Sequence, residues 1–473
     1  MMDSSLLNIV LVTAILVCIT LLIYNKSKLL HSLRSILNSS ETIWHKLPLG
    51  SMGWPFVGET IQFISCAYSD RPESFMDCRR RMYGKVFKSH IFGAPTIVST
   101  DSDVNRFVLQ SDAKAFVPFY PKSLTELMGK SSILLINGSL QRKIHGLVGS
   151  FFKSPLLKHQ ITNDMQNYVQ ISMDKWREDR PIYIQDETKN IAFQVLVKAL
   201  ISLNPGPEME ILKKEFQEFM LGLMSLPVKV PGSQLYRSSQ AKTRMVKIVH
   251  NIIRSKRKTG DMSRVPKDVV DVLVKDASEV LTDDLIAGNM IDMMIPGEDS
   301  VPLLMTLAIK YLSDCPAALH QLTEENMKLK MLKDKNGEPL IWTDYLSLSF
   351  TQSDKDIINS YNFTPFGGGQ RLCPGLDLAK LEASIFLHHF VTSFRWVAQD
   401  DTIVNFPTVR MKSRMPVWVK RRQEIFGTNG EVIDVFILGM RSERGIGFGF
   451  LWFSGMVDAD RDFPVELLQT LWA

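Results

Sequence analysis

Residues 366–375 read FGGGQRLCPG, a glycine-rich loop that brings one cysteine to the start of an apolar helix. Glycine lets the backbone turn tightly and approach a flat ligand closely. A thiolate near a helix N-terminus is stabilised by the helix dipole and by free backbone N–H groups, so Cys373 is a candidate metal ligand. Arg371 can form paired hydrogen bonds with a carboxylate. A lone cysteine in a turn is more often a small buried residue, so Cys373 by itself does not separate these interpretations.

The loop and the helix after it resemble the haem-binding signature of the cytochrome P-450 monooxygenases at six positions: Phe366, Gly369, Arg371, Cys373, Gly375 and Ala379. The resemblance implies that all six bind haem b and that the Cys373 thiolate is the axial ligand of its iron. A thiolate ligand pushes electron density onto haem iron and favours O–O bond cleavage. The implied co-substrates are dioxygen and electrons from NADPH.

The composition is that of a globular protein, with 473 residues of which 45% are hydrophobic and 22% are charged. The five cysteines are scattered and none forms a CxxC pair, so neither a disulfide framework nor a zinc ribbon is indicated. The net charge of +5 is small for this length and does not indicate nucleic-acid binding.

Residues 6–24 are nearly all apolar and are long enough to span a bilayer. Lys26 and Lys28 follow this segment, whereas Asp3 is the only charged residue before it, so the positive-inside rule places the rest of the chain in the cytoplasm. A cleaved signal peptide is the alternative, but a basic start and a small-residue cleavage site are not evident. We predict a single-pass membrane anchor over residues 1–30, in contact with lipid, and a proline-rich hinge over residues 31–58.

Hydrophobic periodicity predicts a mainly α protein with small β-sheets, an α+β fold. Residues 86–91 alternate, and a turn with Gly93 and Pro95 leads to a second strand at 96–98. Apolar residues at helical spacing then predict helices over 141–152, 161–176, 191–203, 208–224, 240–258 and 283–312. The resemblance implies the cytochrome P-450 fold, with the monooxygenase domain over residues 59–422 and terminal strands within 403–422.

The helix over 283–312 contains PGEDSVP at residues 296–302. Two prolines and a glycine predict a local opening that leaves room for water or a ligand. The segment resembles the oxygen-binding kink of the family, which implies a dioxygen groove at Gly297 and a proton relay with Asp299 as the acid and Ser300 as the alcohol. Without the cysteine loop, a plain surface kink is the preferred interpretation.

The helix that begins near residue 138 usually carries, in the family, a tryptophan and four residues later an arginine that binds a haem propionate. Gln141 and His145 stand at these places here. Residues four apart lie on the same side of a helix. We predict that His145 or Arg142 binds the propionate, although each is otherwise an ordinary polar helix residue.

The chain departs from the family between the approach to one helix, at residues 342–352, and the cysteine loop. That helix carries Glu-x-x-Arg in the family, but no arginine of this chain has a glutamate three residues before it. A segment is therefore missing near residues 352–362. Its loss exposes apolar surface and unpaired strand edges. We predict an incomplete P-450 fold that binds haem poorly and has little activity, followed by an atypical tail at residues 423–473.

Three further stretches resemble plant brassinosteroid-synthesising members of the family, namely residues 226–232, 296–302 and 362–366, while residues 371–392 are most similar to the steroid C-23 hydroxylases. The resemblance implies an enzyme of the endoplasmic-reticulum membrane that hydroxylates the side chain of a sterol-derived precursor. NADPH–cytochrome P-450 reductase is the implied partner.

Substrate contacts are expected from residues 116–127 and from Met293, Met294 and Val301, although apolar residues of this kind are more often plain core. Two other classes stay open. One is a haem-thiolate isomerase that needs no reductase, against which the Asp299–Ser300 pair argues. The other is a membrane-tethered product without activity, which the missing segment favours.

Overall fold

The computed structural model describes residues 47–111, 115–259, 265–276, 281–352 and 364–422. The chain divides into two compact units, Met1–Asp101 and Ser102–Ala473. Four parts of the prediction lie outside the described ranges: the anchor, most of the hinge, residues 353–363 and the tail. Within those ranges, every helix is too short or too polar to cross a membrane.

In the described part of the first unit, residues 47–101, there are two helices and a hairpin: α2 (Thr60–Ala67), α3 (Ser74–Tyr83), β1 (Val86–Ile91) and β2 (Ala94–Ser99). The strands pair antiparallel, and Gly93 in the turn has a φ of 77°, which favours glycine. The predicted hairpin is therefore confirmed. The Lys88 backbone N–H donates to the Leu49 carbonyl at 3.0 Å, so this part of the proline-rich segment lies along β1.

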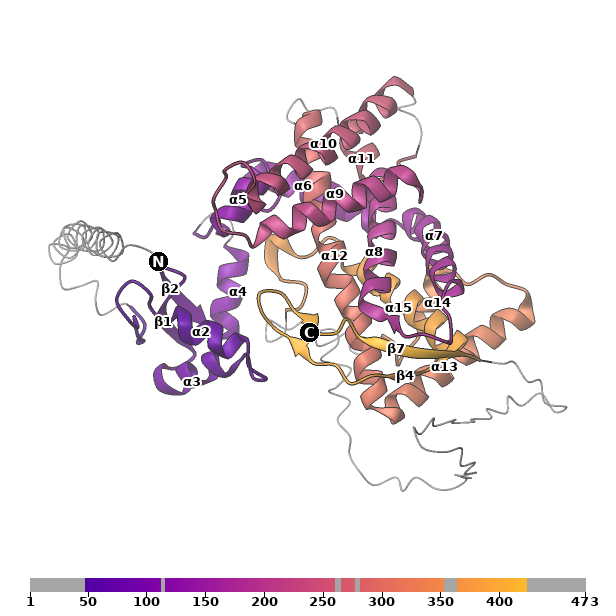
Figure 1. Cartoon of the computed structure of the whole chain (residues 1–473). Coiled ribbons are helices and arrows are strands. Elements are labelled where there is room, and N and C mark those ends of the chain that lie inside the picture. Colours follow the sequence, from indigo (N-terminus) through magenta and orange to yellow (C-terminus); the bar gives the residue numbers. More distant parts are fainter. Residues whose placement is uncertain (1–46, 112–114, 260–264, 277–280, 353–363, 423–473) are drawn as a thin grey trace, which may run out of the picture. The chain divides into compact units, whose positions relative to one another are not determined.

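The second unit is mostly helical. In chain order its helices are α4 (Ser102–Gln110), α5 (Lys122–Met128), α6 (Gly138–Lys153), α7 (Pro155–Asp174), α8 (Ile184–Ile201), α9 (Pro207–Leu223), α10 (Gln234–Thr259), α11 (Val269–Lys275), α12 (Asp283–Asp314), α13 (Pro316–Asn336), α14 (Trp342–Ser347) and α15 (Leu376–Ser393), with one 3-10 turn at Gly369–Arg371 (Figure 1). The six helices predicted from periodicity are confirmed, with ends that differ by a few residues. Helices α4, α5, α11, α13 and α14 were not predicted.

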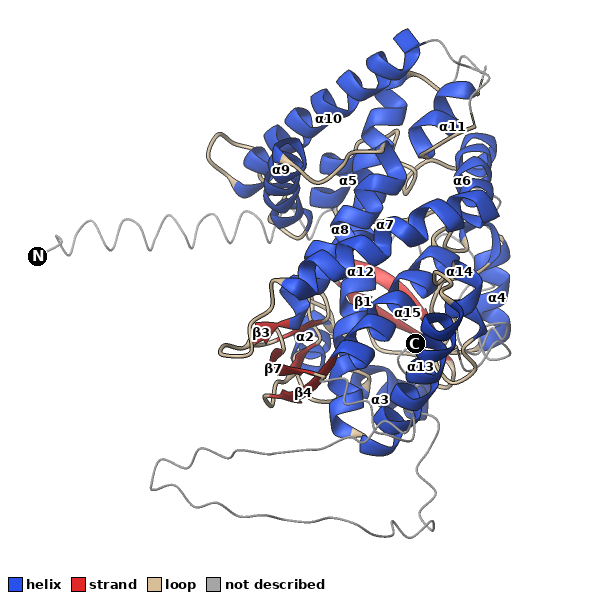
Figure 2. Ribbon diagram, turned by 90° about the vertical axis from the view of Figure 1, so that its right-hand side faces the viewer, coloured by secondary structure: helices blue, strands red, loops and turns tan. Residues whose placement is uncertain are grey.

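The sheets of this unit are small. Strand β7 (Pro416–Arg421) pairs antiparallel with both β3 (Ile182–Tyr183) and β4 (Phe394–Ala398), and β5 (Ile403–Val404) pairs with β6 (Arg410–Met411). Helices dominate the view in Figure 2. The predicted fold class, helix-rich with small sheets, is confirmed.

Helix α15 follows the cysteine loop and is buried along almost its whole length. It packs against α7, α12, α13 and α14. Phe386 and Phe390 stack with ring centroids 5.7 Å apart, and Trp176 meets Phe390 edge-on at 5.8 Å. A helix that is apolar on all sides belongs inside a protein. The cysteine loop is thus attached to the interior of the unit.

Helix α12 runs without a break from Asp283 to Asp314, so the predicted opening at its prolines is wrong as an interruption of the helix. It begins where the Thr282 hydroxyl accepts from the Leu285 backbone N–H at 3.2 Å. Helix α8 packs along it, and the Thr188 and Thr306 hydroxyls both donate to the Pro302 carbonyl, at 3.2 and 2.7 Å. The packing of α8 and the Thr188 hydrogen bond hold the two helices together at Pro302.

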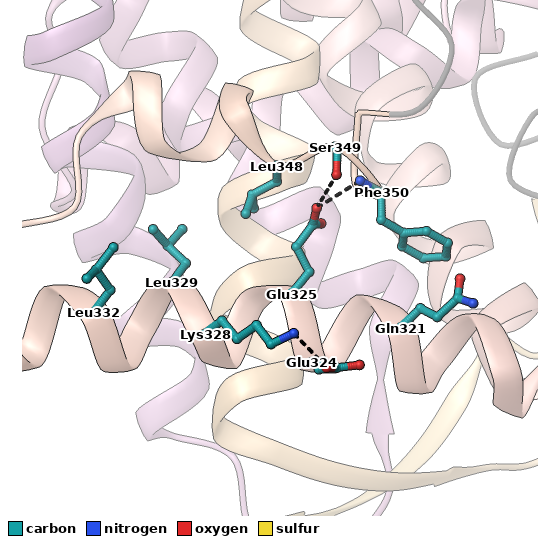
Figure 3. A pocket seen from close by; sticks show the side chains of 9 residues that line it. All are labelled: Gln321, Glu324, Glu325, Lys328, Leu329, Leu332, Leu348, Ser349 and Phe350. Atoms are coloured by element: carbon teal, nitrogen blue, oxygen red, sulfur yellow. Dashed lines mark hydrogen bonds and ion pairs between the residues drawn. The ribbon is translucent and has the colours of Figure 1, made fainter.

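The last described residues before position 353 are held by α13. The Glu325 carboxylate accepts from the Ser349 hydroxyl at 3.2 Å and from the backbone N–H groups of Phe350 and Thr351 at 2.8 and 3.0 Å (Figure 3). A hollow of about 500 Å³ lies along this face of α13, and none of the predicted site residues lines it. Figure 3 therefore shows a place distinct from the candidate site.

Candidate functional site

The cysteine loop is closed by its own backbone. The Cys373 N–H donates to the Phe366 carbonyl at 2.9 Å, and the Gly367 N–H donates to the Thr364 carbonyl at 2.9 Å. These bonds close the turn that carries Cys373, which lies three residues before the first residue of α15. Phe366 thus acts through its backbone, and Ala379 is buried in the first turns of α15.

Gly369 and Gly375 have different reasons to be glycine. Gly369 has a φ of 60°, and a Cβ atom there would lie 2.2 Å from the Leu109 carbonyl oxygen of α4. Any side chain would therefore push the loop away from α4. Gly375 has a φ of −90°, and a Cβ there would lie 3.9 Å from the Cys373 sulfur, an ordinary contact. Of these two glycines, only Gly369 is required by the loop's conformation, and Gly367 also has a positive φ, of 74°.

The environment of the Cys373 sulfur combines burial with one backbone donor. Burial raises the pKa of the Cys373 thiol, and a hydrogen bond from the Gly375 backbone opposes the shift. A bound metal ion deprotonates a coordinating thiol. The Gly375 N–H would then donate to a thiolate ligand.

Arg371 joins the loop to the start of α6. Its guanidinium donates to the Ile136 carbonyl and to Asn137 Oδ1, both at 2.8 Å. Asn137 precedes the first residue of α6, but its side chain does not cap that helix because it accepts from Arg371 instead. Sequence analysis missed Asn137. An asparagine at a helix start is a cap signal, and it gave no hint of a bond to a residue 234 positions away.

Helix α6 passes over the cysteine loop. His145 Nε2 lies 2.7 Å from the Leu372 carbonyl oxygen, and a Cβ atom at Gly149, one turn later, would lie 3.8 Å from Pro374. Gln141, one turn earlier, is buried, and its Oε1 atom has no hydrogen-bond partner among the described residues. Arg142 is exposed. Of the two predicted propionate partners, His145 is therefore the one that contacts the cysteine loop.

The groups around Cys373 fit a haem. The sulfur is the soft ligand that haem iron accepts, and Arg371 and His145 are the kinds of donor that its carboxylates accept. In this structure these donors bond to Ile136, Asn137 and Leu372, so binding of the carboxylates would exchange or share those bonds. Two amide oxygens close to these groups, on Gln141 and Gln370, are buried without a partner among the described residues. Unpartnered buried polar atoms are rare unless another group satisfies them.

The acid and the alcohol of α12 have a different environment. A Cβ atom at Gly297 would lie 2.4 Å from Leu196 Cδ2, so this glycine permits the close approach of α8. Lys189 of α8 binds Glu298 at 3.0 Å and Asp299 at 3.5 Å, and Ser300 is exposed. The structure records no contact between these residues and the described part of the cysteine loop. Their roles in oxygen chemistry stay predictions.

The predicted substrate contacts are also of mixed character. Met294 is fully buried in the core, while Met293 and Val301 are half-buried beside it. Within residues 116–127, Phe119 is exposed and Leu127 is buried. Whether any of them contacts a substrate stays a prediction.

The sequence matches the family model "Cytochrome P450" in two segments, residues 48–353 and 343–416. The 3-epi-6-deoxocathasterone 23-monooxygenase CYP90D1 of Arabidopsis thaliana is 57% identical over 448 residues, with 81% of this chain and 91% of the relative covered. Cytochrome P450 90D2 of Oryza sativa subsp. japonica is 52% identical, covering 80% and 90%. A second 3-epi-6-deoxocathasterone 23-monooxygenase of Arabidopsis thaliana, CYP90C1, is 44% identical, covering 79% and 84%.

Among solved structures, retinoic acid bound cyanobacterial CYP120A1 is similar, with a TM-score of 0.63. It covers 80% of this chain and 99% of that chain at 18% identity, which supports the fold alone. The fold and the cysteine site thus define a haem-thiolate enzyme. The chain belongs to the cytochrome P450 family, and it is a monooxygenase that uses haem iron, dioxygen and NADPH-derived electrons. The predicted similarity to plant C-23 hydroxylases of brassinosteroid synthesis is confirmed.

Proposed function

We propose that this protein hydroxylates the side chain of a sterol-derived brassinosteroid precursor, at the C-23 position. The proposal is supported by the names of two relatives, each a 23-monooxygenase of 3-epi-6-deoxocathasterone. We further propose that an N-terminal anchor holds the enzyme in the endoplasmic-reticulum membrane with its catalytic domain in the cytoplasm. There it receives electrons from NADPH–cytochrome P-450 reductase. The apolar run at residues 6–24 supports the anchor.

The observation that carries the monooxygenase function is the closed cysteine loop. Cys373 is fixed by its bond to Phe366 and has a backbone donor at its sulfur, and the neighbouring Leu372 carbonyl contacts His145. When bound, haem supplies the activation of dioxygen. Cys373 would hold the iron, and Arg371 and His145 would hold the carboxylates of the ring.

Asp299 and Ser300 have the chemistry of a proton relay. The Asp299 carboxylate takes a proton from solvent, to which it is partly exposed, and passes it to the Ser300 oxygen, which at the same time gives up its own hydroxyl proton to the proton acceptor at the site. Lys189 lies 3.5 Å from Asp299 Oδ1 and forms an ion pair with it. The relay therefore requires this ion pair to loosen when the proton moves.

We also propose that this form of the chain holds haem weakly because a segment is missing between Gln352 and the cysteine loop. Two observations support this. The alignment with the 57% identical relative is 448 positions long but covers only 81% of the 473 residues of this chain. It therefore contains positions at which this chain has no residue. The two family-model segments overlap at residues 343–353, next to the proposed gap. A membrane-tethered product without activity is the alternative that the same gap favours.

The test is expression of the full chain with a haem precursor, followed by ferrous–CO difference spectroscopy and by turnover of 3-epi-6-deoxocathasterone with NADPH and a plant reductase. We expect a weak thiolate-type Soret band that is absent in Cys373→Ser. We expect it to grow several-fold when the missing segment of the Arabidopsis relative is inserted after Gln352. A histidine-type band in the restored protein would refute the haem-thiolate function. A strong thiolate-type band without the insertion would refute the weak binding.

A further inference from the structure

The segment between α5 and α6, residues 129–137, is held from two sides. On one side Arg371 of the cysteine loop donates to the Ile136 carbonyl and to Asn137 Oδ1 at 2.8 Å, and more weakly to the Ile133 carbonyl at 3.4 Å. On the other side α12 and α10 hold residues 128–133. The segment thus connects these helices to the haem-binding loop, and we call it the connecting segment.

Asn289 of α12 fixes the middle of the connecting segment. This side chain is 2% exposed. Its Oδ1 accepts from the Ile133 backbone N–H at 2.6 Å, and its Nδ2 donates to the Ser131 carbonyl at 3.1 Å. One amide side chain thus satisfies a backbone donor and a backbone acceptor of an irregular segment, which defines the position of both.

A buried ion pair fixes the beginning of the segment. Lys242 Nζ of α10 lies 2.8 Å from Asp292 Oδ1, and the Asp292 side chain is only 1% exposed. The same ammonium group donates to the carbonyl of Met128, the last residue of α5, at 2.8 Å. Burial raises the pKa of Asp292, while Lys242 and the Ser132 hydroxyl oppose that shift. The ion pair joins α10 to α12, and it also contacts the end of α5 and the connecting segment.

Stability alone does not explain this pair. Desolvating two charges offsets most of their attraction, and an apolar pair of similar volume is often as stable. The charged groups instead fix the geometry of the contact, because Lys242 donates to one carbonyl and Asp292 binds one lysine. The residues held in this way lead directly to the acceptors of Arg371.

We propose that Asn289, Asp292 and Lys242 are positioning residues for haem binding. They fix residues 128–133, and through them the acceptors at 133–137 that orient Arg371 and, with it, the cysteine loop. This inference rests on the proposed function, since it assigns a purpose to Arg371 at the haem carboxylates. These residues touch neither haem nor substrate and act through the connecting segment.

The experiment is hydrogen exchange of the haem-free full chain, with a haemin titration of the same protein. Asn289→Ala, Asp292→Asn and Lys242→Met are compared with the wild type. The matched control is Asp268→Asn, which also removes the charge of a fully buried aspartate paired with a lysine of α10, Lys256 at 2.6 Å. Lys256 keeps its second ion pair, with Asp271 at 2.7 Å, and no contact of Asp268 with the connecting segment is recorded. Lys242→Met keeps the apolar stem of the lysine and removes only its donors.

We expect exchange at residues 131–137 and 366–375 to rise about tenfold or more in the three variants, as for a local opening that becomes easier. The haemin dissociation constant rises by a similar factor. Asp268→Asn leaves both readouts at the wild-type value. Unchanged exchange at 131–137 in folded variants overturns the proposal, and so does an equal rise in the control. Faster exchange at 131–137 with an unchanged cysteine loop and unchanged haemin affinity overturns the coupling to Arg371. If the wild type takes up no haemin, the proposed function fails, while exchange at the two segments still decides this inference.

Discussion

The cysteine loop at residues 366–375 and the middle of α12 at residues 297–300 carry the two halves of the proposed chemistry, but different forces position them. Backbone hydrogen bonds a few residues apart close the cysteine loop. The middle of α12 is instead positioned against another helix, because Leu196 of α8 lies beside Gly297 and Lys189 of α8 binds Asp299. The turn of the loop is therefore closed locally, although Arg371 and the Leu372 carbonyl also tie it to residues 136–137 and to α6, whereas the α12 site is set by the packing of two helices.

This difference predicts how each region fails. A change in the loop distorts the Cys373 position directly, since no other element can restore a backbone turn. A change in α12 is shared with α8, which can repack around it. The following predictions test that distinction.

The largest effect is expected for Gly369→Ala. Alanine at a φ of 60° is strained by about 1–2 kcal/mol, and its Cβ would meet the Leu109 carbonyl oxygen at 2.2 Å. With the displacement of α4 added, we expect a loss of about 3–5 kcal/mol in the free energy of unfolding and no haemin uptake. Urea unfolding and haemin titration measure these two quantities.

Gly375→Ala is the matched control in the same loop. Its Cβ would lie 3.9 Å from the Cys373 sulfur, and its φ of −90° suits alanine. We expect a change below about 1 kcal/mol in the free energy of unfolding. If both variants lose the same stability, the loop is not fixed by the conformation of Gly369.

The same distinction explains what sequence analysis could establish. The loop's role follows from residues that are neighbours in the chain, so Cys373, Arg371 and Gly369 were predicted together. The bonds of Arg371 to Ile136 and Asn137 could not be predicted, because their partners lie more than 230 residues away. The unbroken course of α12 was missed for a similar reason, since α12 packs along α8, whose Thr188 lies 114 residues from Pro302 in the chain. Strand β4 was missed because it continues directly from α15 without a turn signal.

The second prediction concerns the acid on α12. If Asp299 passes protons, Asp299→Asn lowers product formation about a hundredfold, the usual scale for a lost general acid, and leaves haemin affinity unchanged. Product formed per ferrous–CO-competent molecule, measured beside NADPH consumption, separates slow chemistry from poor haem loading. Glu298→Gln is the control, because Glu298 binds the same Lys189. Equal losses in the two variants would assign the effect to the ion pair with α8 rather than to a proton relay.

The third prediction uses Glu382, which lies on α15, the helix that supports the loop. Its side chain is 3% exposed, its Oε1 atom has no hydrogen-bond partner among the described residues, and burial raises the pKa of Glu382 from 4.5 to about 8. The folded state thus prefers the protonated carboxyl, whereas the unfolded chain ionises above the lower pKa. The free energy of unfolding therefore falls as the pH rises from the pKa of Glu382 in the unfolded chain to its pKa in the folded protein. Above the folded pKa, Glu382 makes no further contribution to this pH dependence.

The Glu382→Gln variant removes this titration with little change in shape. Relative to that variant, we expect the wild type to lose about 2 kcal/mol between about pH 5.5 and pH 7. Burial lowers the pKa of His388 to about 3 and of His389 to about 4, so these residues destabilise the fold as the pH falls below 6.5. Both proteins share that effect, and it cancels in the difference between their unfolding curves. A difference that is independent of pH would mean that Glu382 titrates alike in the folded and unfolded chains.

The smallest effect is expected for Gly297→Ala, where the distinction between local structure and packing is sharpest. The new Cβ would meet Leu196 Cδ2 at 2.4 Å, but that atom is the end of a flexible side chain. We expect a loss of about 1–2 kcal/mol, within the range for overpacking, in contrast to the larger loss at Gly369. The Leu196→Ala variant creates the matching space, so the double variant recovers part of the loss of Gly297→Ala in a double-mutant cycle of unfolding free energies. Since no second-site change can restore the backbone turn at Gly369, rescue by Leu196→Ala would mark α12 as the region set by packing. Additive losses would instead mean that Gly297 is needed for the backbone of α12, as the predicted dioxygen groove requires.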